Sequence, residues 1–259
     1  MSTLLDRFAD MITACSEDEI RADVTLDGRL ILDQEGPLTV SYAPIEHIQQ
    51  EAEIVIVGIT PGGFQAAEAL IETRRQLLVG ADQASALRAA KVHASFSGQM
   101  RNALVAMLNH IGLHRHLGIA SSSALWGSHA HLAHFTSALR YPVFRSGENY
   151  RGTPLMTRTP VLRKYLAQCL AEEARTLSQA LWVPCGPKAR EGVQWLVQQH
   201  LLSKDQVLFG MPHPSGANNE RIGYFLGRLR REQLSQQTNP DLIDTAKEEM
   251  MRRVEGAAS

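Results

Sequence analysis

The chain has 259 residues, 44% of them hydrophobic, and its formal net charge is −1. This length allows one large α/β domain with a substantial core, and no apolar run of about 18 residues predicts a membrane-spanning helix. We therefore expect a cytoplasmic protein with no membrane partner and no obligate protein partner. Three cysteines fit a reducing compartment and cannot supply the four ligands of an iron–sulfur cluster; they are Cys15, Cys169 and Cys185.

The charges are unevenly distributed along the chain. Residues 1–53 contain twelve acidic and three basic residues, residues 54–231 contain nine acidic and twenty basic ones, and residues 232–259 contain six and three. A basic centre between acidic ends indicates a core that meets a polyanion such as DNA, although chance segregation on a solvated surface gives the same pattern. We expect an acidic helix and hairpin over 1–50, an α/β core over 51–231, and a polar, helical tail over 232–259.

The N-terminal part predicts a helix followed by a hairpin. Apolar residues recur with helical spacing over residues 4–20. Residues 21–42 predict a β-hairpin that begins with a strand at Val24–Leu26 and turns at Asp27-Gly28. Its later strands are expected at residues 30–32 and 38–40.

A strand and a glycine-rich turn form the centre of the predicted fold. The β-branched run Ile54–Val57 predicts a strand buried on both faces. It ends in the sequence GITPGG, residues 58–63, and an Ala-rich helical pattern follows from Gln65 to Leu78. This order is typical of an ordinary βα turn, and it is also how an open α/β sheet presents a functional loop.

The elements after this centre alternate between helices and strands. We expect a helix over 99–111 capped by residues 95–98, a strand from 133 that ends in a loop, and a helix that Thr159-Pro160 opens and that runs to about 177. Further strands are expected at 181–183 and 206–210, and a last helix at 242–254. Together these elements predict an α/β fold: a single-domain, three-layer α/β/α sandwich with a mostly parallel central sheet.

Six histidines occur close together in the sequence: His110, His114, His116, His129, His131 and His134. A zinc site is one interpretation, but no carboxylate or cysteine accompanies them, and the last three cannot all share one face of a helix or strand. We prefer solvated histidines or histidines satisfied in the core, and we predict no metal.

The predicted late strand leads into a second unusual stretch, MPHPSGANN, residues 211–219. Two prolines enclose His213, which therefore presents its side chain rigidly. Together, the two stretches resemble the signature motifs of the uracil-DNA glycosylase superfamily. GITPGGF is similar to GMNPGPF and HPSGAN to HPSPRN, both from the single-strand-selective monofunctional branch. The resemblance covers roughly residues 40–230.

The resemblance implies roles for particular residues. Catalysis falls to Thr60, at the position of a water-positioning asparagine, and to His213, which donates a hydrogen bond to the departing base. The base pocket comprises Gly58, Ile59, Pro61, Gly62, Gln65, Phe135 and Ser137. In the second motif, Ser215, Asn218 and Arg221 are expected to contact DNA, with Asn218 or Arg221 as the wedge in base flipping. Apart from the resemblance, arginines interleaved with aromatic residues indicate further phosphate contacts, although arginines of such a loop can also pair locally; they are Arg140, Arg145, Arg151 and Arg158.

These residues predict a monofunctional DNA glycosylase without a cofactor, because no lysine beside either motif can form a Schiff base. Thr60 and Ser137 are shorter than the asparagines of the family and leave room for a base larger than uracil. We therefore favour a bulky modified cytosine in phage DNA, as removed by bacterial antiviral members of the superfamily. Uracil excision in repair of single- or double-stranded DNA is the alternative. Because Thr60 replaces asparagine, a catalytically silent nucleic-acid-binding protein on the same fold is another.

Overall fold

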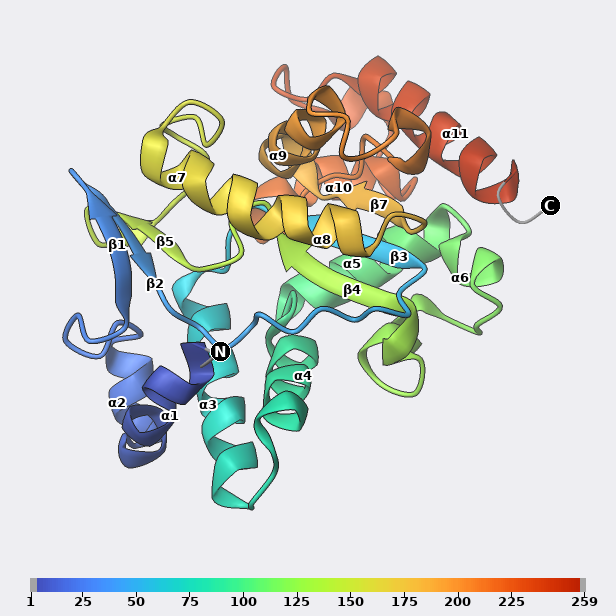
Figure 1. Ribbon diagram of the computed structural model, residues 1–259. Coiled ribbons are helices and arrows are strands. Elements are labelled where there is room, and N and C mark those ends of the chain that lie inside the picture. Colours follow the sequence, from blue (N-terminus) through green and yellow to red (C-terminus); the bar gives the residue numbers. More distant parts are fainter. Residues whose placement is uncertain (1–3, 257–259) are drawn as a thin grey trace. The chain divides into compact units, whose positions relative to one another are not determined.

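A computed structural model describes residues 4–256 of the chain (Figure 1). The chain forms two compact units, and each is assembled from three separate stretches. The first unit contains Met1–Ile48, Ile59–Ser97 and Ser137–Glu173, and the second contains Gln49–Gly58, Gly98–Thr136 and Ala174–Ser259. The first unit therefore crosses the division expected near residue 50, and the second crosses the one expected near residue 231.

The first unit contains a four-stranded sheet in the order β1-β2-β5-β6. Its strands are β1 (Ile31–Glu35), β2 (Leu38–Ser41), β5 (Val143–Arg145) and β6 (Glu148–Asn149), and each pairs with its neighbour in antiparallel register. The predicted hairpin exists, but its position was wrong. Residues 24–30 form turns, and β1 connects to β2 at Gly36-Pro37. Gly36 has a φ of +56°, which suits this tight reversal, and Asp27 and Gly28 also have positive φ within the turns at residues 24–30.

Helices complete the first unit: α1 (Leu4–Ala14), α2 (Glu17–Ala22), α3 (Gly63–Leu78), α4 (Gln83–Ala94), α7 (Pro160–Tyr165), a π-helical turn (Leu166–Leu170) and the start of α8 (Ala171–Thr176). The single helix expected over 4–20 is two helices, because the Ser16 side chain accepts a hydrogen bond from the Glu19 N–H and starts a new one. The helix that Thr159-Pro160 opens is confirmed, interrupted by the π-helical turn. α3 packs along α1 and α4 (Figure 1).

The second unit is built on a three-stranded sheet in the order β4-β3-β7. β3 (Ile54–Gly58) is its middle strand, flanked by β4 (Ala133–Ser137) and β7 (Leu181–Pro184), and β3 and β7 run parallel. Every residue of β3 is buried, as its β-branched run predicts. The α/β class and the parallel pairing at its centre are therefore confirmed. The strand expected at 206–210 was wrong, because only Val207 forms a bridge, to Trp182.

The helices of the second unit are α5 (Gln99–His110), α6 (Leu113–His116), α9 (Gly186–Gln198), α10 (Asn219–Phe225) and α11 (Pro240–Gly256). Short 3-10 turns lie at Ser122–Trp126, Ala130–Leu132, Lys204–Gln206, Gly216–Asn218 and Arg231–Gln233. α5 begins as expected, but no serine caps it; Gly98, with a φ of +73°, is its N-cap. The predicted tail helix is confirmed as α11, and Asn239 Oδ1 accepts from the Asp241 N–H over 3.0 Å. No helix in the described part of the chain could cross a bilayer.

Candidate functional site

The first motif connects β3 to α3, and Thr60 fixes it to the segment before β5. The Thr60 hydroxyl donates to the Tyr141 carbonyl over 2.9 Å and accepts from the Val143 N–H over 3.1 Å. Nearby, the Leu139 N–H donates to the Ile59 carbonyl over 3.0 Å. A hydroxyl has one hydrogen and two lone pairs, so Thr60 keeps one lone pair with which to hold a water.

The rest of the first motif forms the N-terminus of α3. The Gly62 N–H donates to Gln65 Oε1 over 3.2 Å, and the Gly63 N–H donates to Asn149 Oδ1 over 2.9 Å. These bonds satisfy two of the amide groups that a helix leaves unpaired at its start. One lone pair of the carbonyl oxygen of Gln65, predicted to line the base pocket, is therefore engaged by its own helix, and the other lone pair and the amide nitrogen remain for a ligand.

The second motif packs against the start of α9 in the second unit. Gly186 has a φ of +84°, and a Cβ there would lie 2.8 Å from the His213 Cβ. The Gly186 N–H also donates to the Met211 carbonyl over 2.8 Å. Only glycine satisfies both the backbone conformation and the close approach, so Gly186 sets the position of His213.

A chain of hydrogen bonds fixes the orientation and the tautomer of His213. Arg221 Nη1 donates to Asn218 Oδ1 over 3.2 Å, and Asn218 Nδ2 donates to Ser215 Oγ over 3.1 Å. Ser215 Oγ lies 2.9 Å from His213 Nδ1, which also accepts from the Ser215 N–H over 3.3 Å. Because Nδ1 accepts, the ring hydrogen lies on Nε2. Burial lowers the pKa of His213, which keeps the imidazole neutral.

This series of hydrogen bonds changes the interpretation of three predicted DNA contacts. Ser215, Asn218 and Arg221 have side chains that are already engaged with one another and with His213. Arg221 also donates from Nη2 to the Gln237 carbonyl over 2.9 Å. The structure therefore gives them a role that the sequence did not predict, which is to position the histidine.

Arg140 was predicted to contact DNA, and this was wrong. Its side chain is only 7% exposed, and its guanidinium forms ion pairs with Glu173 over 2.9 Å and with Glu172 over 3.2 Å. Lys91 Nζ lies 4.0 Å from the same Glu173 oxygen. Burial lowers the pKa of Lys91 to about 8, while the Glu173 carboxylate opposes this shift. Arg140 therefore belongs to a buried ion cluster of the first unit.

The remaining predicted DNA contacts lie on the surface. Arg145, Arg151 and Arg158 are exposed, and Arg145 donates from Nη1 to the Thr153 carbonyl over 3.3 Å. Guanidinium groups that project from loops and strand ends are suited to phosphate contacts. Their contact with DNA stays a prediction.

The predicted base-pocket residues differ in how accessible they are. Phe135 is 2% exposed and stacks on Trp126, with ring centroids 4.4 Å apart. A covered ring of this kind packs the core of the second unit and has no face for a base, so its predicted role was wrong. Ser137, at the end of β4, is half-buried and stays available. Gly58 is buried, whereas Ile59, Pro61 and Gly62 are half-buried.

The histidines do not form a metal centre. Within residues 4–256, no three His, Cys, Asp or Glu side chains come close enough together to hold a metal ion. His134 is buried in β4, and its Nδ1 accepts from the Gln49 N–H over 3.3 Å. His129 and His131 are side by side, with ring centroids 6.0 Å apart.

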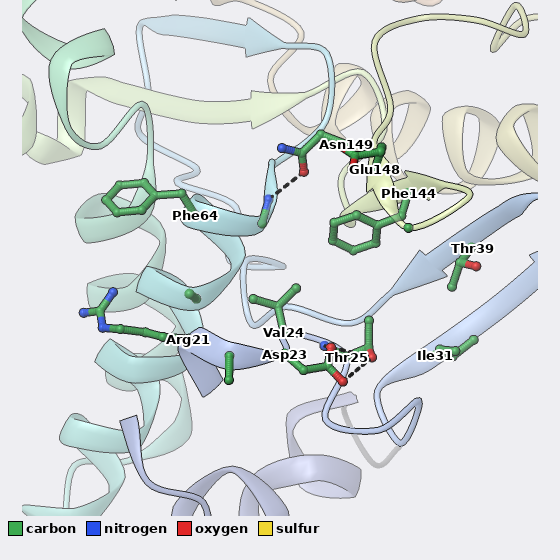
Figure 2. Close-up of a pocket in the computed structure, with 14 residues that line it drawn as sticks. Arg21, Asp23, Val24, Thr25, Ile31, Thr39, Phe64, Phe144, Glu148 and Asn149 are labelled. Carbon is green, nitrogen blue, oxygen red and sulfur yellow. Dashed lines mark hydrogen bonds between the residues drawn. The ribbon is translucent and has the colours of Figure 1, made fainter. Parts of the chain in front are cut away.

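The first unit contains an open cavity of about 690 Å³ that the sequence did not predict (Figure 2). α2 and the turn after it, the four-stranded sheet and the first turns of α3 form its walls. Its lining residues are Arg21, Ala22, Asp23, Val24, Thr25, Ile31, Thr39, Gly63, Phe64, Ala67, Phe144, Gly147, Glu148 and Asn149. The one usable signal in the sequence was Phe64, a large apolar residue directly after two glycines.

The protein therefore belongs to the α/β class, and its second motif holds a neutral histidine, His213, in a fixed orientation. Comparison with known proteins places the chain in a family. It is 36% identical over 236 residues to the protein described as "Uncharacterized protein YoxB" of Bacillus subtilis (strain 168), an alignment that covers 90% of this chain and 91% of YoxB. The chain belongs to the same family as YoxB. No family model matches the chain, and no solved structure matches it.

Proposed function

We propose that the protein is a monofunctional DNA glycosylase of the uracil-DNA glycosylase superfamily. It hydrolyses the N-glycosidic bond of a flipped-out pyrimidine and leaves an abasic site. The observation that supports this proposal most is the hydrogen-bond chain that ends at His213. An enzyme needs such a chain where a fixed donor must meet a developing negative charge.

The departing base acquires negative charge as the glycosidic bond breaks. The Nε2–H group of His213 donates to the base oxygen that carries this charge. Because burial lowers the pKa of His213, the ring acts as a neutral donor. The fixed position of this donor stabilises the transition state, because a group that is already oriented loses no free energy by reorganising when the charge appears.

The water that attacks C1′ is held less firmly than the departing base, by one hydrogen bond to Thr60. Thr60 can accept one hydrogen bond from it with its remaining lone pair. The short side chain of Ser137 leaves space beside the base, which favours a bulky modified cytosine over uracil as the substrate. Arg145, Arg151 and Arg158 hold the DNA phosphates. With phage DNA as the substrate, we propose an antiviral role in the cytoplasm.

A second candidate function follows from Thr60. Its hydroxyl donates to the Tyr141 carbonyl and accepts from the Val143 N–H. Thr60 therefore also has a structural role, because it connects the first motif to the segment before β5. A protein that uses Thr60 only in this way would bind nucleic acid without cleaving it. The same basic surface would serve that function.

Cleavage assays distinguish these functions. The purified protein is incubated with uracil-containing DNA and with phage DNA rich in modified cytosine, and abasic sites are detected by alkaline cleavage on a gel. The proposal expects abasic sites in the modified DNA and a loss of roughly 100-fold or more in single-turnover rate for His213→Ala, with DNA binding retained. Cleavage of uracil-containing DNA alone would identify a repair enzyme, and no cleavage of either DNA would favour the silent binding protein.

A further inference from the structure

The cavity of the first unit has an aromatic wall on each side of the first turn of α3. Phe64 is 54% exposed, although large apolar side chains are usually covered. Phe144, on β5, is buried and presents its ring from the opposite side (Figure 2). Gly63 lies between them, and a Cβ built there would lie 3.9 Å from Phe144 Cε1. Gly63 therefore places no side chain between the start of α3 and the ring of Phe144.

Two of the charged side chains that line the cavity are already satisfied. Arg21 Nη1 pairs with Glu68 over 2.7 Å. Asp23 accepts hydrogen bonds from the Thr25 N–H and hydroxyl and from the Asp27 N–H. Neither side chain needs a ligand to complete its hydrogen bonds.

Two neighbouring side chains of β6 are available instead. Glu148 is exposed, and its side chain forms no ion pair or hydrogen bond within the described residues, so its carboxylate can accept. Asn149 uses Oδ1 to accept from the Gly63 N–H, and this bond directs its Nδ2 hydrogens elsewhere. The residues that line the cavity therefore include an acceptor and a donor as well as aromatic rings.

We infer that this cavity is a binding site for an unpaired nucleobase. The flat faces of a base stack on Phe64 or Phe144, and its hydrogen-bonding edge alternates donors and acceptors as Glu148 and Asn149 require. In a duplex that edge is occupied by the opposite base, so only an unpaired base fits. The volume of about 690 Å³ is within the range of about 300–1,000 Å³ that is typical of small-molecule sites.

The charge of the cavity indicates which part of a nucleotide enters. Arg21 is paired with Glu68, whereas the carboxylates of Asp23 and Glu148 form no ion pair within the described residues, and their negative charges repel phosphate. The base therefore enters and its phosphate stays outside. The base can belong to a single-stranded nucleic acid or to a free nucleoside, and binding there does not require base excision.

Fluorescence anisotropy with a labelled single-stranded 12-mer that contains no modified base tests this inference at fixed salt. Phe64→Ala should weaken binding by about fivefold or more, the scale of one lost base–aromatic stack, and should leave binding of the matching duplex unchanged. Leu78→Ala is the matched control, because Leu78 is a 56% exposed apolar residue of the same helix. It should leave both affinities unchanged.

Asn149→Asp is the sharper variant. A carboxylate still accepts from the Gly63 N–H, so α3 keeps its cap, but the donor for the base is replaced by a negative charge. Single-strand binding should weaken by about fivefold or more, while the melting temperature should change by no more than about 2 °C. If neither Phe64→Ala nor Asn149→Asp weakens single-strand binding, the inference is wrong.

Two further comparisons are needed. The first distinguishes a free nucleoside from single-stranded nucleic acid as the source of the base, and the second distinguishes this binding site from the proposed glycosylase function. Saturation-transfer NMR with free nucleosides should show contact that Phe64→Ala removes if a free nucleoside is the ligand; contact only with the 12-mer identifies single-stranded nucleic acid. A protein that cleaves no DNA but loses single-strand affinity in Phe64→Ala retains this site without the glycosylase function. A protein that cleaves DNA, with affinities unchanged in both variants, retains only the glycosylase function.

Discussion

Glu173 Oε1 lies 2.9 Å from a guanidinium nitrogen of Arg140 and 4.0 Å from Lys91 Nζ, so one fully buried carboxylate faces two buried cations. Removing the carboxylate leaves both cations without this partner. We expect Glu173→Gln to lower the free energy of unfolding by about 3–5 kcal/mol, the usual cost of an uncompensated buried charge. Lys91→Met should change it by less than about 1 kcal/mol, because Arg140 still pairs with Glu173. Urea denaturation measures both, and equal losses would contradict the assignment.

His47 predicts a dependence of stability on pH. Burial, together with the nearby charges of Lys91 and Arg88, lowers the pKa of His47 from 6.5 to about 4. Because the folded pKa is depressed, the unfolded chain binds the proton more readily, and stability falls as the pH decreases from about 6.5 to about 4. His47 is half-exposed to solvent, so we expect a loss on the order of 1 kcal/mol. His47→Gln should remove this part of the pH dependence in denaturation curves.

Ser215 should act as a positioning residue for His213. Ser215→Ala removes the hydroxyl that lies 2.9 Å from Nδ1 and leaves only the weaker contact from the backbone N–H. We expect roughly tenfold slower single-turnover excision and partial transfer of the ring hydrogen to Nδ1, which nitrogen-15 NMR of the imidazole detects without reference to activity. Ser215→Thr should restore both. A His213 spectrum identical in Ser215→Ala and the unmodified protein would contradict this role.

Ser137 tests the choice of substrate. Ser137→Asn refills the space beside the base and adds a carboxamide. Excision of a bulky modified cytosine should fall at least about tenfold, since a side chain that occupies the substrate's volume raises the barrier by more than about 1.4 kcal/mol. Excision of uracil should appear or increase. Parallel gel assays on both DNAs measure the ratio, and an unchanged ratio would remove Ser137 from the pocket.

The three exposed arginines test where DNA binds. Reversing the charge at Arg145, Arg151 and Arg158 together should weaken duplex binding and reduce the dependence of log K on log salt. Each lost phosphate contact lowers that slope by about 1. Unchanged affinity and slope in the triple variant would indicate that DNA binds elsewhere, in the region of Arg228–Arg231.

The sequence predicted the elements that have strong local signals. The β-branched run of β3 and the Pro-opened α7 have backbone preferences that leave few alternatives, and both are confirmed. The hairpin was misplaced because Asp27-Gly28 and Gly36-Pro37 are equally good turn sequences. Only the pairing of β2 with β5, more than 100 residues later, selects the second.

The site was less predictable because its contacts connect distant residues. Nothing near Arg140 in the sequence indicates that Glu173 would bury it, and nothing near Phe135 indicates Trp126 over its ring. Asn149 reaches Gly63 across 86 positions of the chain. By contrast, the hydrogen bonds that lead to His213 lie within the nine residues His213–Arg221 and follow from local turn geometry, so Ser215 and Asn218 could have been assigned to positioning from the sequence.

The interleaved composition of the two units has a consequence for how the protein can be divided. The chain passes from one unit to the other five times, so no contiguous fragment consists of one unit alone. A single cut anywhere between residues 49 and 173 therefore divides both units between the two fragments, and neither unit could be exchanged between proteins as a contiguous module. We expect the two units to unfold in one calorimetric transition, and separately expressed halves to regain structure only when they are mixed.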